Sequence, residues 1–392
     1  MSPKNVIARG LSPVERAICV GTADQAQGVR ELDAKLPPDE DAALWEEARL
    51  NGVESIVAHS LMRSGVREGA AEAWRKAHDD TYARISAYVT ELDRVASLLD
   101  SHGIRLVALK NAGIAKGLGV CLGCCPMGDL DVLVDQADFR AAHRLLERDG
   151  YRFEFRSPLE IADLPSADAS GGAEYWKPFP EGGKLWLELQ WRPISGRWIR
   201  PDQEPSGRDL IERSMTIPGS AVRILSAEDN LLQVCLHTAK HSYVRAPGFR
   251  LHTDVDRVVR RQAVNWDKFL AQVSALRVKT AVYFSLALAH DLLGSPIEPR
   301  VLSALAPPGW KVKLMSSWLR RVGLFHPDDK KFSRVGYVLF TALLYDDPRG
   351  LWRAIFPSPT WMREQFRVRK SFLLPYYYGR RIADLLLRRV SS

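Results

Sequence analysis

Apolar residues between residues 31 and 101 recur at spacings of three and four, with charged residues between them. The clearest stripe consists of Ile85, Val89, Leu92, Val95 and Leu99. This spacing places apolar side chains along one face of a helix. We therefore expect residues 31–101 to form a helical lead-in. Residues 1–30 show no clear periodicity and are expected to be a loose start.

Three short segments that follow have the pattern of strands, being β-branched-rich or alternating and bounded by turn residues. They are Ile104–Leu109, Asp129–Val134 and Lys184–Trp191. Between the second and third, a helix is predicted to open at Asp135 and Asp138 and to end at Gly150. The segment Ser157–Gly183 is rich in Pro, Ser, Asp and Gly, which predicts a long loop.

After Pro193 the chain is again predicted to be helical. Ser226–Asp229 has the signature of a helix N-cap, and helices are expected at Asp254–Arg261 and Lys279–Leu293. The order of these elements predicts an α+β protein. Its expected parts are a loose N-terminus (1–30), a helical lead-in (31–101), a strand-containing core (102–195), a helical domain (196–306) and a C-terminal region (307–392).

The composition is that of an ordinary globular protein. Of the 392 residues, 46% are hydrophobic and 26% charged, which excludes a disordered, collagenous or coiled-coil chain. The apolar runs Thr280–His290 and Val335–Tyr345 have 11 residues each, about half of what a membrane helix needs. The N-terminus lacks the apolar stretch of a secretory signal, so we expect no transmembrane segment and a cytoplasmic location.

Positive charge is concentrated in the C-terminal region. The whole chain has a net charge of +8, whereas residues 311–392 carry 17 Lys and Arg against 6 Asp and Glu. Its interleaved aromatics are Trp352, Phe356, Trp361, Phe366, Phe372, Tyr376, Tyr377 and Tyr378. This pattern suits a peripheral polyanion contact through residues 307–392, either with RNA or with an anionic membrane surface. It equally suits aromatics that pack as core beside solvated arginines.

Five cysteines form an odd number in a large chain with no export signal, which makes a disulfide framework improbable. Cys121 and Cys124 form a C-x-x-C, but the spaced histidine pair, His237 and His241, is more than a hundred residues away. We expect reduced cysteines in a loop rather than a metal site. A metalloprotease is excluded because no H-E-x-x-H glutamate accompanies the histidine pair.

The acidic residues of the predicted strands are the strongest candidates for a functional site. Asp129 and Asp131 are two apart and so point to the same side of their strand, where two carboxylates repel one another unless a cation lies between them. Glu188 is the only acid in an otherwise apolar and aromatic strand. Two strands could present three hard oxygen ligands to Mg²⁺. Lys110 and Asn111 follow another strand and open a helix, a suitable place for phosphates.

The runs that carry a resemblance are LVALKNAGIAKGL, CCPMGDLDVLVD and FRAAHRLLERDGYRF, with ILSAEDNLLQVCLHTAKH and IFPSPTWMREQF later. Over roughly residues 30–375 the chain resembles the uncharacterised nucleotidyltransferase family of the polymerase-beta-type superfamily. Its members share a strand ending in Leu-Lys-Gly, an Arg-Pro-x-x-Asp-x-Asp strand, a helix and Gly-Tyr. The chain departs from this pattern where Asn111 replaces the turn glycine, Cys125 the arginine and Gln190 a histidine.

The resemblance implies a polymerase-beta-type core, a small mixed sheet with helices, at residues 102–195, and a helical domain at 196–306 that completes the cleft. The implied catalytic and metal-binding residues are Asp129, Asp131 and Glu188. The expected nucleotide contacts are Lys110, Asn111, Gly128, His237, Lys240 and His241. The alternative for His237, Lys240 and His241 is that they lie on the solvated face of the helix that begins after Ser226 and contact no nucleotide.

The implied reaction is transfer of a nucleoside monophosphate from an NTP to a hydroxyl acceptor by two Mg²⁺ or Mn²⁺ ions. The acceptor can be a small molecule, a peptide, a protein or an RNA. The alternative function is that of a descendant with reduced or no activity. Such a protein would bind a polyanion or a protein partner through the basic C-terminal region.

Overall fold

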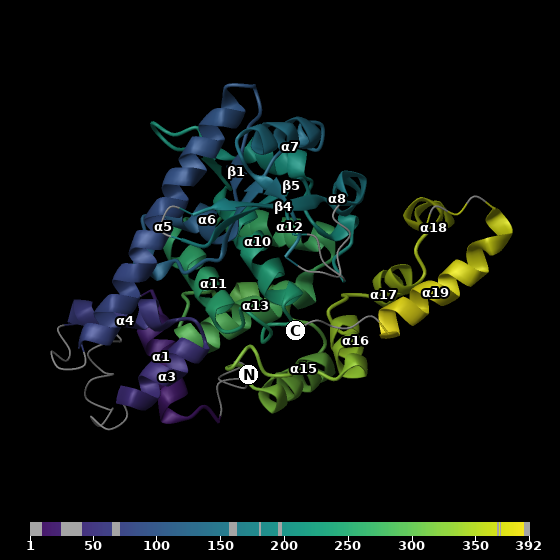
Figure 1. Ribbon diagram of the computed structural model, residues 1–392. Coiled ribbons are helices and arrows are strands. Elements are labelled where there is room, and N and C mark those ends of the chain that lie inside the picture. The colour runs from purple at the N-terminus through teal and green to yellow at the C-terminus, as the bar shows by residue number, and fades with distance from the viewer. Residues whose placement is uncertain are drawn as a thin grey trace.

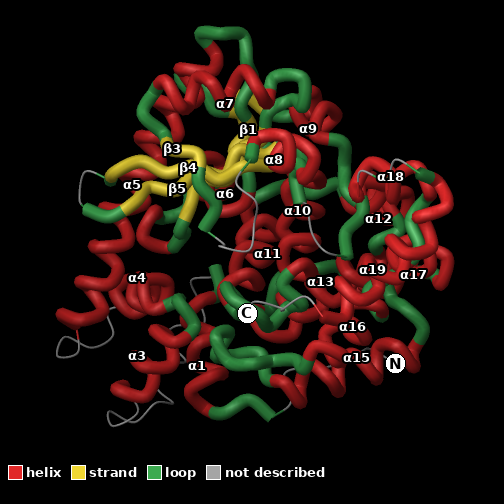
Figure 2. Tube along the Cα trace, turned by 45° about the vertical axis from the view of Figure 1, so that its right-hand side comes forward, coloured by secondary structure: helices red, strands yellow, loops and turns green. Residues whose placement is uncertain are grey.

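A computed structural model describes residues 10–24, 41–64, 71–156, 163–179, 182–194, 198–366, 368 and 370–387. Within these residues a mixed sheet of seven strands lies among helices that precede and follow it in the chain (Figures 1 and 2). This arrangement confirms the expected α+β class, with a mixed sheet and helical N-terminal and C-terminal regions.

The helical lead-in is present, and it begins earlier than expected. Its helices are α1 (Pro13–Thr22), α3 (Asp41–Leu50), α4 (Glu54–Ser64) and α5 (Ala71–Asp100). Helix α1 lies inside the segment expected to be loose, and a capping box between Ser12 and Glu15 starts it. The expectation of a loose start is therefore wrong for α1. Residues 1–9 and 25–30 of the expected loose start lie outside the described residues.

The sheet has the strand order β3-β4-β5-β2-β1-β7-β6. In chain order the strands are β1 (Val107–Ala108), β2 (Asp129–Leu133), β3 (Arg152–Phe153), β4 (Gly172–Pro178), β5 (Lys184–Gln190), β6 (Met215–Thr216) and β7 (Arg223–Ile224). β2 pairs in parallel with β5 and antiparallel with β1, and β5 pairs antiparallel with β4. The three strands expected from the sequence are thus present, with shorter bounds.

Alternation along β2 and β5 directs one face of the sheet to the main core, whereas the other face carries the acids and, at Leu133, a smaller second core. Leu130 and Val132 of β2 and Leu187 of β5 are fully buried in the main core. Phe139 and Leu146 of α7 (Phe139–Arg148) belong to the same core. Side chains two residues apart share a face, so Asp129, Asp131 and Glu188 lie on the opposite, polar face.

The segment expected to be one long loop contains two elements. They are α8 (Leu164–Ser170) and β4, which pairs along its whole length with β5. Ala173 and Tyr175 alternate with polar residues and are buried, which explains why β4 is stable. The expectation was wrong because a pattern of only two apolar positions was hidden among turn residues. Helix α7 also begins later than expected, since Asp135 forms a turn by accepting from the Ala137 N–H.

Helices surround the polar face and continue beyond it. They are α6 (Lys110–Gly117), η2 (Leu122–Cys124), η3 (Pro201–Gln203), α9 (Gly207–Arg213), α10 (Ala227–Lys240), α11 (Arg250–Arg261), α12 (Trp266–Leu276), α13 (Lys279–Leu293) and α14 (Pro299–Leu305). The predicted cap of α10 is confirmed, since the Ser226 hydroxyl accepts from the Asp229 N–H. Helices α10, α11 and α13 pack against one another, and α6 contacts both α10 and α11.

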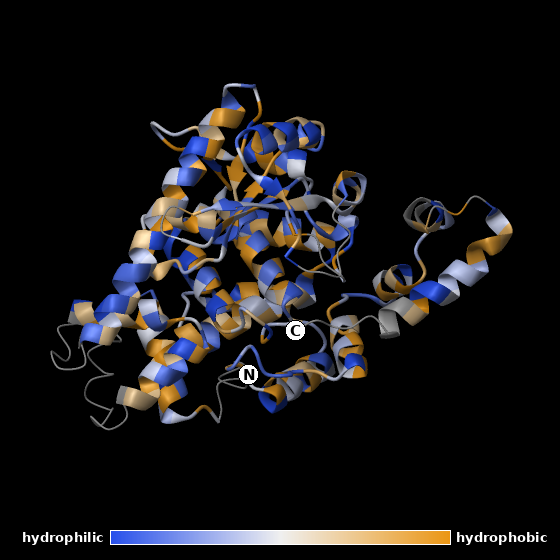
Figure 3. Cartoon of the chain, viewed as in Figure 1, coloured by the Kyte–Doolittle hydropathy of each residue, from blue (hydrophilic) through white to orange (hydrophobic). Residues whose placement is uncertain are grey.

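The C-terminal region is helical, and its last part extends away from the body as an arm (Figure 1). Its elements are α15 (Gly309–Val322), α16 (Arg334–Ala342), α17 (Pro348–Ile355), α18 (Pro359–Phe366), η4 (Ser371–Leu373) and α19 (Leu374–Leu387). Apolar and polar residues alternate along this arm (Figure 3). Among the described residues, no helix is both long enough and apolar enough to span a membrane.

Candidate active site

Three carboxylates converge on the polar face of the sheet. Asp131 of β2 lies directly opposite Glu188 of β5 in the parallel register, and Asp129 precedes Asp131 by two residues. One oxygen from each of the three side chains lies within 4.8 Å of the others. Asp131 is 6% exposed, whereas Asp129 and Glu188 are partly exposed at the rim. The strand pairing therefore brings together the three acids that the sequence indicated.

Lys110 places its ammonium group inside this acidic cluster. Its Nζ lies 2.5 Å from Asp131 Oδ1 and 3.7 Å from Glu188 Oε2. The residue has a left-handed backbone with φ of 50°, and its N–H donates to Gln233 Oε1 of α10 at 3.0 Å. Gln190 Nε2 donates to the same Asp131 oxygen at 3.0 Å. Lys110 is therefore a partner of the acids here, and its expected contact with phosphates stays a prediction.

Burial and neighbouring charges shift the pKa values of Asp131 and Glu188 in opposite directions. Burial raises the pKa of Asp131 well above its usual value, the positive charge of Lys110 opposes this rise, and the charges of Asp129 and Glu188 add to it. Burial would also raise the pKa of Glu188, but Lys110, Lys240 and a hydrogen bond with Asp131 lower it to about 2. The close approach of these two carboxyl groups in a buried place contributes both to the raised pKa of Asp131 and to the lowered pKa of Glu188.

Asp129 is held by an arginine from outside the two strands. Arg156 Nη2 donates to Asp129 Oδ2 at 2.6 Å and to Glu174 Oε1 at 3.1 Å. Glu174 belongs to β4 and lies opposite Glu188 in the antiparallel register. Strand β4, which the sequence analysis did not predict, thus contributes Glu174 as a fourth acid beside the cluster. Arg156 neutralises part of the negative charge of Glu174.

The C-terminal end of α10 lies within electrostatic reach of the cluster. Lys240 and His237 both interact electrostatically with Lys110, and Lys240 also interacts with Glu188 and Asp131. Burial lowers the pKa of Lys240 and of His237, and it lowers that of His241 to about 3. The rings of His237 and His241 meet edge to face at 4.9 Å. The side chains of His237, Lys240 and His241 are partly buried, so the face of α10 that carries them is not fully exposed to solvent.

The remaining expected nucleotide contacts lie at the margin. Asn111 Nδ2 donates to Asp254 Oδ2 of α11 at 3.3 Å, and Asn111 Oδ1 is buried without a hydrogen-bond partner. Gly128 is exposed, its carbonyl accepts from the Tyr88 hydroxyl at 3.3 Å, and a Cβ there would meet nothing within 4 Å. The structure therefore leaves open space directly before Asp129.

Arg250, at the start of α11, is a site residue that the sequence analysis missed. It interacts electrostatically with Asp254 and Asp129, and its Nε is buried without a hydrogen-bond partner. Burial lowers the pKa of its guanidinium group. No local motif marks Arg250, because it reaches Asp129 only through the packing of α11 against α6.

Two departures from the family pattern also have a structural account. Cys125 is fully buried, and its thiol contacts the Cys121 carbonyl at 3.7 Å. Position 125 therefore supplies no charge, whereas Arg250 brings a guanidinium group within electrostatic reach of Asp129. Gln190 donates a hydrogen bond to Asp131, and a neutral histidine at this position could donate the same bond.

The family model described as Uncharacterised nucleotidyltransferase matches residues 37–294 of the 392. The chain belongs to this family. The match covers the lead-in from α3 onward, the whole sheet, and helices α10 to α13 of this nucleotidyltransferase family member. No match was found among curated proteins or among solved structures.

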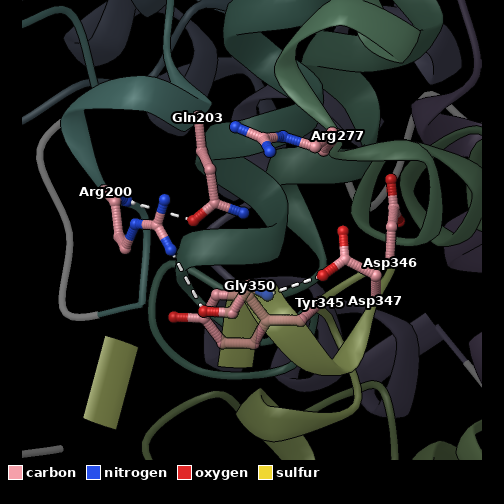
Figure 4. Close-up of a pocket in the computed structure, with 7 residues that line it drawn as sticks. All are labelled: Arg200, Gln203, Arg277, Tyr345, Asp346, Asp347 and Gly350. Atoms are coloured by element: carbon pink, nitrogen blue, oxygen red, sulfur yellow. Dashed lines mark hydrogen bonds between the residues drawn. The ribbon is translucent and has the colours of Figure 1, made fainter. Parts of the chain in front are cut away.

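A small pocket elsewhere in the molecule lies between η3, the end of α12 and the start of α17 (Figure 4). It is lined by Arg200, Gln203, Arg277, Tyr345, Asp346, Asp347 and Gly350. Arg200 donates to the Gly350 carbonyl at 3.1 Å, and the Gly350 N–H donates to Asp347 at 2.6 Å. These polar groups satisfy one another, which is typical of a contact between structural segments.

Proposed function

We propose that this protein transfers a nucleoside monophosphate from an NTP to a hydroxyl acceptor, with divalent cations held by Asp129, Asp131 and Glu188. The observation that carries the proposal is the convergence of these three carboxylates from two paired strands in a member of a nucleotidyltransferase family. Carboxylate oxygens are the ligands that Mg²⁺ and Mn²⁺ prefer.

The donor set fits such a cation. Lys110 and Arg156 compensate part of the negative charge of the cluster through ion pairs with Asp131 and Asp129. A dication supplies the same compensation through stronger bonds to hard oxygens. When bound, the cations would polarise the acceptor hydroxyl and neutralise charge on the α-phosphate and the departing pyrophosphate.

Individual side chains can be assigned separate roles in this reaction. We assign Glu188 to cation binding, because it lies directly opposite Asp131 in the strand register and shares the cluster of three carboxylates. Lys240 and Arg250 supply positive charge on either side of the acids and are assigned to the phosphates of the donor nucleotide. Positioning and charge neutralisation then account for the rate, as expected for transfer at phosphorus.

The proposal is tested by thermal melts with ATP, GTP, CTP and UTP, each with and without Mg²⁺ or Mn²⁺. A ligand at a hundred times its Kd adds about 2.7 kcal/mol, which a melt detects readily. We expect the metal-dependent shift to vanish in Asp131→Asn. The matched control is Asp135→Asn, which removes the same charge just past the end of β2, where Asp135 pairs with Arg208 at 2.9 Å.

A shift that persists unchanged in Asp131→Asn would refute the cation assignment. A nucleotide shift lost equally in Asp135→Asn would trace the effect to general charge and not to the cluster. The nucleotide that gives the largest metal-dependent shift then serves in an assay of pyrophosphate release with candidate hydroxyl acceptors.

A polyanion contact through residues 307–392 is a second proposal. Trp352 is 63% exposed, Phe372 74% and Tyr376 65%, so large aromatic surfaces on the arm face solvent. Other aromatics of the region, such as Phe340 and Tyr345, are buried and belong to the core. Single-stranded RNA binding by the full chain, compared with Trp352→Ala and Phe372→Ala, tests this idea. Unchanged binding would assign these aromatics another role.

A further inference from the structure

A second cluster of metal-binding side chains lies outside the acidic site. His59 comes from α4, His78 from α5, and Cys121 from the loop that contains η2. One ligand atom from each lies within 4.8 Å of the others. His78 Nε2 is 3.2 Å from Cys121 Sγ, and His59 is also hydrogen-bonded to this sulfur. The three residues are far apart in the sequence, so the tertiary fold assembles them.

Cys124 lies outside this group of three, but it is the candidate for a fourth donor because its thiol is next to Cys121. The turn of η2 brings its thiol into a hydrogen bond with Cys121, and the residue is 7% exposed. Cys125 differs, since its thiol contacts the Cys121 carbonyl at 3.7 Å instead. Metal binding requires deprotonated thiols, so a zinc ion here would displace the protons of Cys121 and Cys124.

The surroundings of His78 favour metal binding by its Nε2. Its other nitrogen, Nδ1, lies 3.1 Å from Asp79 Oδ1, and a carboxylate on the far nitrogen orients a metal-binding imidazole. The His78 ring lies against Gly123, where a Cβ would come within 2.4 Å of Nε2. The ring stacks on His59 with centroids 5.3 Å apart. Only a glycine at position 123 leaves room for the imidazole beside the cysteine turn.

We propose that His59, His78, Cys121 and Cys124 bind one zinc ion as a tetrahedral structural site. Two thiolates of a C-x-x-C with two imidazoles are a donor set typical of structural zinc. In such a site, bonds of about 2.1 to 2.3 Å place neighbouring donor atoms roughly 3.6 Å apart. The spacing between His78 and Cys121 is already close to this at 3.2 Å, whereas the Cys124 side chain would have to turn towards the two histidines to complete the site.

The proposed site lies next to the approach to the acidic cluster. The loop after Cys125 leads directly to Asp129, and α5 holds it at two further points. Arg84 donates to the Met127 carbonyl at 2.8 Å, and Tyr88 to the Gly128 carbonyl at 3.3 Å. A zinc ion that joins α4, α5 and this loop would fix the start of β2 from which Asp129 projects.

The experiment is metal analysis of the full-length protein, produced in zinc-supplemented medium and washed with EDTA. About one zinc per chain is expected for the wild type, and less than a tenth of that for Cys121→Ser and His59→Asn. Cys125→Ser is the matched control, because it changes a neighbouring thiol that is not a ligand. Asp131→Asn is a second control that alters only the other cation site. Both controls should keep their zinc.

Replacement of zinc by Co²⁺ gives an independent readout. Cobalt bound by thiolates gives an intense near-ultraviolet charge-transfer band, which the wild type and Cys125→Ser should show and Cys121→Ser should lose. This spectrum decides the question for the wild type even if a ligand variant fails to fold. Absence of zinc and of the band, with Cys121 and Cys124 present as free thiols or as a disulfide, would overturn the proposal. Loss of zinc in Cys125→Ser would overturn the assignment of the ligands.

Discussion

Replacement of Lys110 by methionine tests the charge balance of the acidic cluster. Methionine matches the length of the lysine stem and keeps the packing, but it removes the ammonium group that lies 2.5 Å from Asp131 and 3.7 Å from Glu188. Neither residue is glycine, so the left-handed backbone at position 110 is equally strained in both proteins.

The expected loss of stability is large because the pair is buried. Lys110 and Asp131 side chains are 9% and 8% exposed. Removal of one partner from a buried ion pair costs about 3 to 5 kcal/mol, and proton uptake by Asp131 keeps the loss near the lower end. A loss of about 3 kcal/mol corresponds to a melting temperature lower by roughly 4 °C in a chain of this size.

The assay is a thermal melt at neutral pH with EDTA and then with Mn²⁺. We expect Lys110→Met to melt well below the wild type in EDTA and to gain more from Mn²⁺, because the cation no longer competes with the ammonium group. The control is Lys116→Met, on the same helix α6, where the lysine pairs with Asp93 at 2.7 Å and Asp93 is 39% exposed. That variant should lose less than about 1 kcal/mol.

Two results would refute this reasoning. Equal melting temperatures for Lys110→Met and Lys116→Met in EDTA would mean that the acids do not depend on the ammonium group. An equal gain from Mn²⁺ in the wild type and in Lys110→Met would mean that cations bind elsewhere.

Three further outcomes are expected. Burial opposes ionisation of Glu91, but its partners lower its pKa from 4.5 to about 2. The ionised Glu91 carboxylate therefore stabilises the folded protein fully above pH 4.5, and this contribution is lost as the pH falls towards 2. At pH 7 the wild type should exceed Glu91→Gln in free energy of unfolding by on the order of 2 kcal/mol. Urea titrations should show this difference shrinking between pH 5 and 3. Tyr175→Ala should cost about 3 to 5 kcal/mol because Tyr175 is fully buried in β4, whereas Tyr376→Ala, 65% exposed, should cost almost nothing; equal melts would contradict the role of β4. Gly123→Ala should lower the zinc content because its Cβ displaces His78, and Gly379→Ala, with open space around it, should not; a full zinc content in Gly123→Ala would contradict the placement of His78.

Local patterns in the sequence were sufficient for much of the architecture. The apolar spacing of α5, the cap of α10 and the alternation of β2 and β5 are set by neighbours within a few residues, and the structure contains all of them. The pairing of acids on one face also follows from the strand period alone. The loop expected before β5 was wrong, since β4 is stabilised mainly by its pairing with β5 rather than by its own composition.

Only the tertiary structure decided which side chains meet. The register of β2 with β5 sets Glu188 opposite Asp131, and the packing of α6 against α10 directs Lys110 towards the acids. Helix α11 brings Arg250 within electrostatic reach of Asp129. In the same way, the fold brings His59 and His78 to Cys121, although the sequence indicated no histidine partner for the cysteines. These contacts join segments separated by tens of residues or more, and they depend on the free energy of packing the whole core, which no local pattern encodes.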